Sequence, residues 1–263
     1  MRDKLLGWHV SKKACLTMHD KEIFVFVHAA KSAGSSFWRS LVKACQGNPD
    51  IGVADSYHES IARFGTENRQ NDAACELYRE FGRIRKSKLL LHYHSDEPGL
   101  HLLTPTMMPI TFILLIRNEV DRLKSAYKWY LQTEVFSSVA STQEQSMAFF
   151  NTFLSKGYSS LLPGILGGNS APQLSAAAPS VPRIALVTVD DYNNPNESAA
   201  MRSLVSLLDC DEPEPFVFPE TVSRYHAIKA MIPAPDNYEF WDRVHICASQ
   251  EVSYIRSLPL VNS

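Results

Sequence analysis

The chain has 263 residues, of which 45% are hydrophobic and 21% charged, and its 26 basic and 28 acidic side chains give a net charge of −2. This composition is typical of a folded globular protein and excludes an intrinsically disordered chain or a disulfide-dense miniprotein. Because the charge is nearly balanced, no overall field recruits nucleic acid or an anionic membrane, so an anionic ligand must be met by a local patch.

The alternation of apolar, β-branched runs with amphipathic stretches is typical of parallel strands connected by crossover helices. Strands are expected at Glu22–His28, Lys88–His94, Ile110–Ile116 and Ile184–Val189. Helices are expected from the loop after the first strand to Cys45, across the polar stretch 56–86, from Glu119 onward, and over 142–154, 197–208 and 236–258. Residues 163–182 are rich in Gly, Pro, Ser and Ala and are expected to form a long loop. The pattern predicts an α/β fold in a single domain over residues 1–263.

The cysteines and the apolar runs indicate the cellular compartment of the protein. Its five cysteines are widely spaced and lack a CxxC pair, which predicts neither a disulfide framework nor a cysteine zinc site. The first 18 residues lack the apolar core of a signal peptide, and the longest apolar run, Ile110–Ile116, is far shorter than a bilayer span. We therefore expect a soluble protein in a reducing, cytoplasmic compartment.

A small-residue loop connects the first expected strand to the first helix. In the segment from His28 to Phe37, backbone N–H groups and the positive end of the helix can converge on one anion. Lys31 adds a full positive charge, and Gly34 allows a positive φ or a close ligand approach. The hydroxyls of Ser35 and Ser36 either bind anion oxygens or merely cap the helix. The loop is a candidate phosphate or sulfate cradle.

A second candidate anion contact follows the strand Ile110–Ile116. Arg117 stands at the exit of this strand, and Ser125 comes eight residues later on the expected helix. A guanidinium can clamp a phosphate through two parallel hydrogen bonds, and the adjacent helix start supplies N–H donors. Arg122 either belongs to this motif or pairs with a neighbouring carboxylate and faces water. The spacing alone is weak evidence; its weight comes from its order after the first loop, since ligands bind at the carboxyl ends of parallel strands.

Together the two motifs resemble those of sulfotransferases that use 3′-phosphoadenosine 5′-phosphosulfate (PAPS), nearest the glycan and uronyl O-sulfotransferase branch. The run K-S-A-G-S-S resembles the 5′-phosphosulfate loop of this family, and ILLIRNEVDRLKSAY resembles its 3′-phosphate motif. Ala30 stands where the family usually has proline, and Asn118 and Glu119 replace Asp-Pro. A nucleotide triphosphatase loop would instead place the lysine after its second glycine. The resemblance covers residues 22–45 and 88–131 well, and 184–208 loosely.

The resemblance implies a P-loop-like three-layer sandwich around a mostly parallel sheet, and it implies roles for the matching residues. The 5′-phosphosulfate would contact Lys31, Ser32, Ala33, Gly34, Ser35 and Ser36, and the 3′-phosphate would contact Arg117 and Ser125. The donor would be PAPS and the product PAP, with no metal. The expected reaction moves a sulfuryl group to a hydroxyl or amine of a small-molecule acceptor, and a homodimer is left open.

Two histidines are candidates for the base that takes the acceptor's proton. His92 and His94 are two residues apart, so on a strand they share a face. Some uronyl 2-O-sulfotransferases carry a similar His-x-His, which implies His94 as the base with His92 as its partner or alternative, while Lys31 stabilises the leaving group. A structural role or a metal site remain alternatives for the pair. Asp96 or Glu97 could orient an imidazole, although solvation at the surface suits them better.

Other functions fit the sequence less well. A nucleotide kinase would need a lysine after Gly34, and this chain has none there. Only Asp190 or Asp191 could be offered as its magnesium ligand. A sulfotransferase for a glycan acceptor could use the basic side chains of residues 79–88. A non-catalytic nucleotide-binding module would keep both anion sites without a working base.

Overall fold

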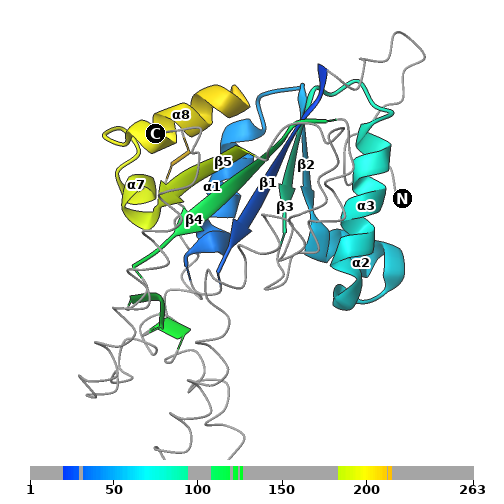
Figure 1. Ribbon diagram of the computed structural model, residues 1–263, viewed down its shortest axis with the longest axis horizontal. Helices are drawn as coiled ribbons and strands as arrows, with labels where there is room; N and C mark the ends of the chain where they lie inside the picture. Colours follow the sequence, from blue (N-terminus) through cyan, green and yellow to red (C-terminus); the bar gives the residue numbers. More distant parts are fainter. Residues whose placement is uncertain are drawn as a thin grey trace, which may run out of the picture.

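The computed structural model describes residues 20–29, 32–93, 108–118, 121–123, 125–126, 183–211 and 213–214. Its centre is a five-stranded, all-parallel sheet in the order β2-β3-β1-β4-β5 (Figure 1). The strands are β1 Glu22–His28, β2 Ile51–Asp55, β3 Lys88–His92, β4 Ile110–Ile116 and β5 Arg183–Thr188. The predicted α/β class with a parallel central sheet is confirmed.

Helices cover both faces of the sheet and make three layers. They are α1 Gly34–Cys45, α2 Ser56–Phe64, the 3₁₀ helix η3 Glu67–Arg69, α3 Gln70–Phe81, α7 Val189–Asn193 and α8 Ala199–Leu208. One core joins the sheet to buried side chains of α1, α7 and α8, and the other joins it to α3. The expected apolar face of Leu77, Tyr78 and Phe81 is buried in the α3 core.

The central strands are buried on both faces, which explains their nearly continuous apolar sequences. In β1, Val25 and Val27 enter the α3 core, whereas Phe24 and Phe26 enter the α1 core. Alternate side chains of a strand point to opposite faces, so a strand covered on both faces has no polar side. All seven residues of β4 are buried for the same reason.

β3 ends at His92 rather than at the predicted His94, and the structure differs from the predicted elements in three further places. The pattern does not predict β2, a five-residue strand that contains a glycine. The polar stretch 56–86 is broken at Gly65, whose φ of 71° ends α2. The short helix α7 begins directly after β5 with a reciprocal cap between Thr188 and Asp191. The elements expected at 142–154, 163–182 and 236–258 lie outside the described residues.

None of the helices in the described ranges combines the length and the hydropathy needed to cross a bilayer.

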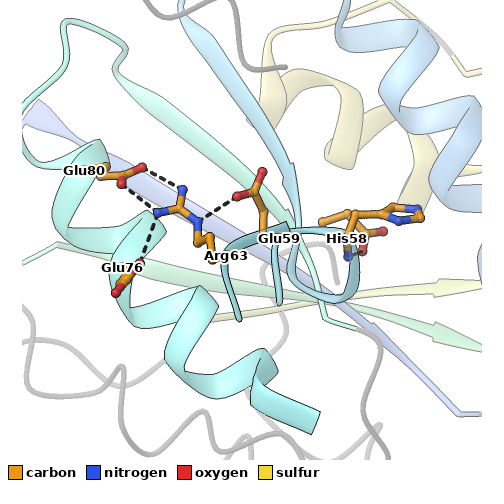
Figure 2. A network of polar contacts seen from close by, with 6 residues as sticks. His58, Glu59, Arg63, Glu76 and Glu80 are labelled. Atoms are coloured by element: carbon orange, nitrogen blue, oxygen red, sulfur yellow. Dashed lines mark hydrogen bonds and ion pairs between the residues drawn. The ribbon is translucent and has the colours of Figure 1, made fainter. Parts of the chain in front are cut away.

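One ion-pair network fastens α2 to α3 at the side of the sheet (Figure 2). The guanidinium of Arg63 contacts Glu59 at 2.8 Å within α2, and it contacts Glu80 at 2.7 Å and Glu76 at 3.2 Å on α3. The hydrogen bonds from Arg63 lower the pKa of the Glu80 carboxyl, against the smaller opposing effect of burial. The network joins two helices whose only covalent connection here runs through the turn at Gly65 and η3.

We expect Arg63→Ala to lower the free energy of unfolding at pH 7 by about 1–2 kcal/mol, because each of its three partly exposed ion pairs contributes up to about 1 kcal/mol. The folded-state pKa of Glu80 is lowered, so its contribution is present above the ordinary glutamate pKa and is lost as the pH falls through the folded value. Urea unfolding at pH 7 and at about pH 3 should therefore show a difference that shrinks in acid.

The matched control is Lys43→Ala, which removes an ion pair to Glu214 in which both side chains are mostly exposed. We expect a change close to zero for this variant. Equal losses for Arg63→Ala and Lys43→Ala would contradict the stabilising role of the α2–α3 network.

Candidate functional site

The candidate site lies where the chain connections leave the sheet in opposite directions. From β1 the chain goes toward β2 on one side, and from β4 it goes toward β5 on the other. The two strands are neighbours, and His28 near the end of β1 is paired with Leu115 near the end of β4. In open parallel sheets ligands bind at the carboxyl edge at such a switch point. The loop after β1 and the segment after β4 therefore start side by side.

The loop after β1 turns tightly around one carbonyl oxygen. Ala29 O accepts hydrogen bonds from Ser32 N at 3.2 Å, from Ser32 Oγ at 2.7 Å and from His28 Nδ1 at 3.0 Å. The Ser32 side chain is fully buried, and its hydrogen bond to Ala29 O stabilises the turn. Ala33 then takes the left-handed conformation with a φ of 65°. Lys31 and Ala30 lie outside the described residues.

The first turn of α1 is capped by backbone alone. Ala33 occupies the N-cap position without a side-chain hydrogen bond, and its carbonyl accepts from Ser36 N and Phe37 N, both at 3.1 Å. Gly34 and Ser35 come before these two donors in the chain, and the first N–H groups of an α-helix have no carbonyl acceptor within the helix. The alternative that Ser35 or Ser36 merely caps the helix is therefore wrong: the capping position belongs to an alanine. The side chains of Ser35, exposed, and Ser36, half-buried, stand on the first turn.

Gly34 is needed for packing rather than for its φ. A Cβ at this position would lie 2.2 Å from the nearest atom of the His28 ring, well inside van der Waals contact. The positive φ that the sequence suggested for Gly34 is taken by Ala33 instead. His28 thus lies against the start of α1 and forms one wall of the loop.

We expect Gly34→Ala to lower the free energy of unfolding by about 1–3 kcal/mol, because the added methyl group overlaps an imidazole held by its neighbours. Thermal unfolding measures the loss. The double variant Gly34→Ala/His28→Ala should recover part of it, since the overlap is then gone. Gly47→Ala is the matched control: there a Cβ meets only Asp211 Oδ2, at 4.0 Å, and a loss as large as that of Gly34→Ala would contradict the packing explanation.

The segment after β4 is built as the sequence predicts, with one exception. Arg117 is half-buried directly after the strand, and half-buried Ser125 lies in the helical residues that follow. Asn118 caps this helix: its Oδ1 accepts from Asp121 N at 3.3 Å, and its carbonyl accepts from Arg122 N at 2.9 Å. Arg122 does not face water but is fully buried. Asn118 therefore caps the helical residues that follow β4.

His92 ends β3 and is held by a carboxylate from the neighbouring strand. Its Nδ1 lies 2.7 Å from Asp55 Oδ2, and the side chain is 2% exposed. Burial would raise the pKa of the Asp55 carboxyl, but the hydrogen bond and charge interaction with His92, together with the backbone N–H of His58, lower it below its usual value. Asp55 is therefore an acceptor at neutral pH. His94 lies outside the described residues.

Asp55 is the functional candidate that the sequence reasoning missed. The carboxylates that the sequence offered as possible imidazole partners, Asp96 and Glu97, lie outside the described residues. The signal for Asp55 was its place after the short run Ile51–Ala54 and before a helical pattern, which marks both a strand end and an N-cap. Within the described ranges, no three His, Cys, Asp or Glu side chains gather as a metal site.

Comparison with known proteins relates the chain to solved structures only. No protein-family model and no curated protein matches it. A sulfotransferase from Alicyclobacillus acidocaldarius is 17% identical with a TM-score of 0.52, covering 89% of this chain and 95% of that one. At this identity the likeness shows the fold, which is thus an α/β fold shared with this bacterial sulfotransferase.

Two other solved structures are less similar. Mouse sulfotransferase SULT7A1 complexed with PAP is 12% identical with a TM-score of 0.41, covering 84% of this chain and 70% of that one. A structure from the PezAT toxin–antitoxin system of Streptococcus pneumoniae is 11% identical with a TM-score of 0.38, covering 98% of this chain and 93% of that one.

Proposed function

We propose that this protein is a sulfotransferase that moves a sulfuryl group from PAPS to a hydroxyl or amine of a small-molecule acceptor. The observation that carries the proposal is the placement of both sulfotransferase-like motifs at the carboxyl ends of β1 and β4, the adjacent strands at the switch point. A fold shared with a bacterial sulfotransferase supports it.

The loop after β1 fits the 5′-phosphosulfate end of the donor. The start of α1 has no side-chain cap, and the N–H groups of Gly34 and Ser35 precede its first intrahelical bonds. Such a helix end attracts an anion through its N–H groups and its positive dipole. In the proposal the hydroxyls of Ser35 and Ser36 add hydrogen bonds, and Lys31 adds the charge that stabilises the departing phosphate oxygen.

The segment after β4 fits the 3′-phosphate. Arg117 leaves the strand half-buried, so its guanidinium can form two parallel hydrogen bonds to phosphate without full desolvation. In the proposal the hydroxyl of Ser125, eight residues further along the chain, donates a third hydrogen bond to the same phosphate. Two anion contacts on neighbouring strands suit a carrier with phosphates at both ends of one nucleoside better than a triphosphate chain, which places all its charge at one end.

Transfer also needs a group that accepts the acceptor's proton. In the proposed reaction the acceptor oxygen or nitrogen forms a bond to sulfur, the bond from sulfur to the phosphate oxygen breaks, and PAP leaves. The proton goes to an imidazole, either that of His92 at the end of β3 or that of His94. Histidine suits this role because its ordinary pKa lies near neutrality.

We expect calorimetry to detect PAP binding to the wild type, with ATP and magnesium binding more weakly. Arg117→Ala should weaken PAP binding by roughly 10- to 150-fold, because hydrogen bonds to charged groups contribute about 1.5–3 kcal/mol. The matched control is Arg183→Ala: this arginine begins β5, at the opposite edge of the sheet, and pairs with Glu22 at 2.8 Å. Preference for ATP with magnesium, or equal effects of the two substitutions, would refute the assignment.

Turnover is tested with sulfur-labelled PAPS and a panel of phenols, alcohols and amines. We expect transfer by the wild type and a loss of about a hundredfold or more in kcat for Lys31→Ala, because a charge that acts on the leaving group stabilises mainly the transition state. Tight PAP binding with no transfer to any acceptor would favour a non-catalytic nucleotide-binding module.

A further inference from the structure

Asp55 and His92 meet because of the parallel register of β2 and β3. The two residues are direct partners across these strands, and each is the last residue of its strand. Neighbours in register project to the same face, here the face covered by α1. Their side chains join through His92 Nδ1 and Asp55 Oδ2 at 2.7 Å. The contact is therefore fixed by the sheet rather than by mobile surface side chains.

The Asp55 carboxylate is itself held on its other oxygen. Oδ1 accepts from Tyr57 N at 3.0 Å and from His58 N at 3.2 Å, at the start of α2. These bonds and the positive end of the helix favour the charged form, in keeping with the lowered pKa of Asp55. A carboxylate only accepts hydrogen bonds, so Nδ1 of His92 must carry a hydrogen and, in the neutral ring, Nε2 carries the basic lone pair.

Stacked rings hold the plane of the His92 imidazole. The distance from the centroid of the His92 ring to the ring centroid is 4.9 Å for Trp38, 5.2 Å for Phe26 and 5.4 Å for His28, and all three pairs are stacked. Titratable neighbours of His92 include His28 from β1 and Asp55 from β2, and His58 of α2 acts in turn on Asp55. With the ring plane and Nδ1 held in this way, a proton gained by the neutral His92 ring goes to Nε2, an atom that is buried in the structure.

This imidazole also stands next to the loop after β1. Phe26 is its partner in register on β1, and Tyr93 N donates to Phe26 O at 3.0 Å. His28, which stacks on His92, is the same ring that lies against Gly34 at the start of α1. One continuous set of contacts therefore runs from Asp55 through His92 and His28 to the candidate anion loop.

From this geometry we infer that Asp55 is a positioning residue that makes His92, rather than His94, the base. Asp55 holds the Nδ1–H tautomer, Nε2 accepts the proton of the acceptor as its oxygen or nitrogen attacks sulfur, and the carboxylate stabilises the imidazolium that forms. The inference rests on the proposed sulfuryl transfer, and it adds a residue that lies outside both sulfotransferase-like motifs.

The tautomer is tested without any ligand. Long-range proton–nitrogen spectra of protein labelled with nitrogen-15 in histidine distinguish Nδ1–H from Nε2–H rings. We expect wild-type His92, assigned by its loss in His92→Gln, as the Nδ1–H form, and a mixture of forms in Asp55→Asn. Asparagine keeps an oxygen that can cap α2 but carries no charge. A wild-type ring in the Nε2–H form would overturn the inference.

The catalytic role is tested with labelled PAPS and the best acceptor of the panel. Asp55→Asn should lower kcat at least about tenfold while PAP affinity stays within about twofold, because the carboxylate acts on proton transfer and not on donor binding. The base works when neutral, and the carboxylate stabilises its protonated form. Removing the charge should therefore move the acidic limb of the kcat/KM profile to lower pH.

Three variants separate this role from a structural one. Asp55→Ser keeps a residue able to cap α2 but cannot reach His92, so it should behave like Asp55→Asn. Ser198 caps α8, and its Oγ accepts a hydrogen bond from Met201 N at 3.1 Å. Ser198→Ala removes this cap and should lower the stability without moving the pH profile. His92→Gln should abolish transfer with PAP binding retained.

The outcomes are distinguishable. An active wild type in which His94→Gln abolishes transfer while His92→Gln and Asp55→Asn keep it would overturn the inference and leave the proposed function standing. A wild type that neither binds PAP nor transfers sulfate would remove the proposed function and the inference together.

Discussion

The parallel pairing of β1 with β3 on one side and β4 on the other is the constraint on which the candidate site depends. Because all these strands run in the same direction, each one ends at the same edge of the sheet. Burial under α1 on one face and α3 on the other assigns alternate side chains of a strand to two different cores, so a slip of one strand by one residue would exchange the side chains that it sends to each core. The loop after β1, Arg117 and His92 are thereby brought to one edge.

The parts of the fold that the sequence predicts well are those with a long, unambiguous pattern. β4 is expected at Ile110–Ile116 and is found there, because seven residues buried on both faces leave a continuous apolar run. β2 is not predicted, because Ile51–Asp55 is short, contains a glycine and forms the edge of the described sheet. Its place follows from pairing with β3, which local sequence does not encode.

The same distinction holds within the site. Ser32 to Ser36 lie together in the chain, and a contiguous motif can be identified from their order alone. The contact between Asp55 and His92 spans 37 residues and requires β2 to be known first. Gly34 was expected to allow a positive φ or a close ligand approach, but the left-handed residue is Ala33. The structure needs the glycine because His28 lies against it, a contact visible only once β1 and α1 are packed.

This distinction has a chemical consequence. An anion is held well by local backbone, because successive N–H groups at a helix start already converge. A base has to be held in one tautomer and one plane, which requires a charged partner and ring neighbours from other elements. For His92 these come from β2, β1 and α1, as Asp55, Phe26 and Trp38. In the proposed reaction, donor binding and proton transfer would therefore depend on different parts of the sheet edge, and substitutions would separate them.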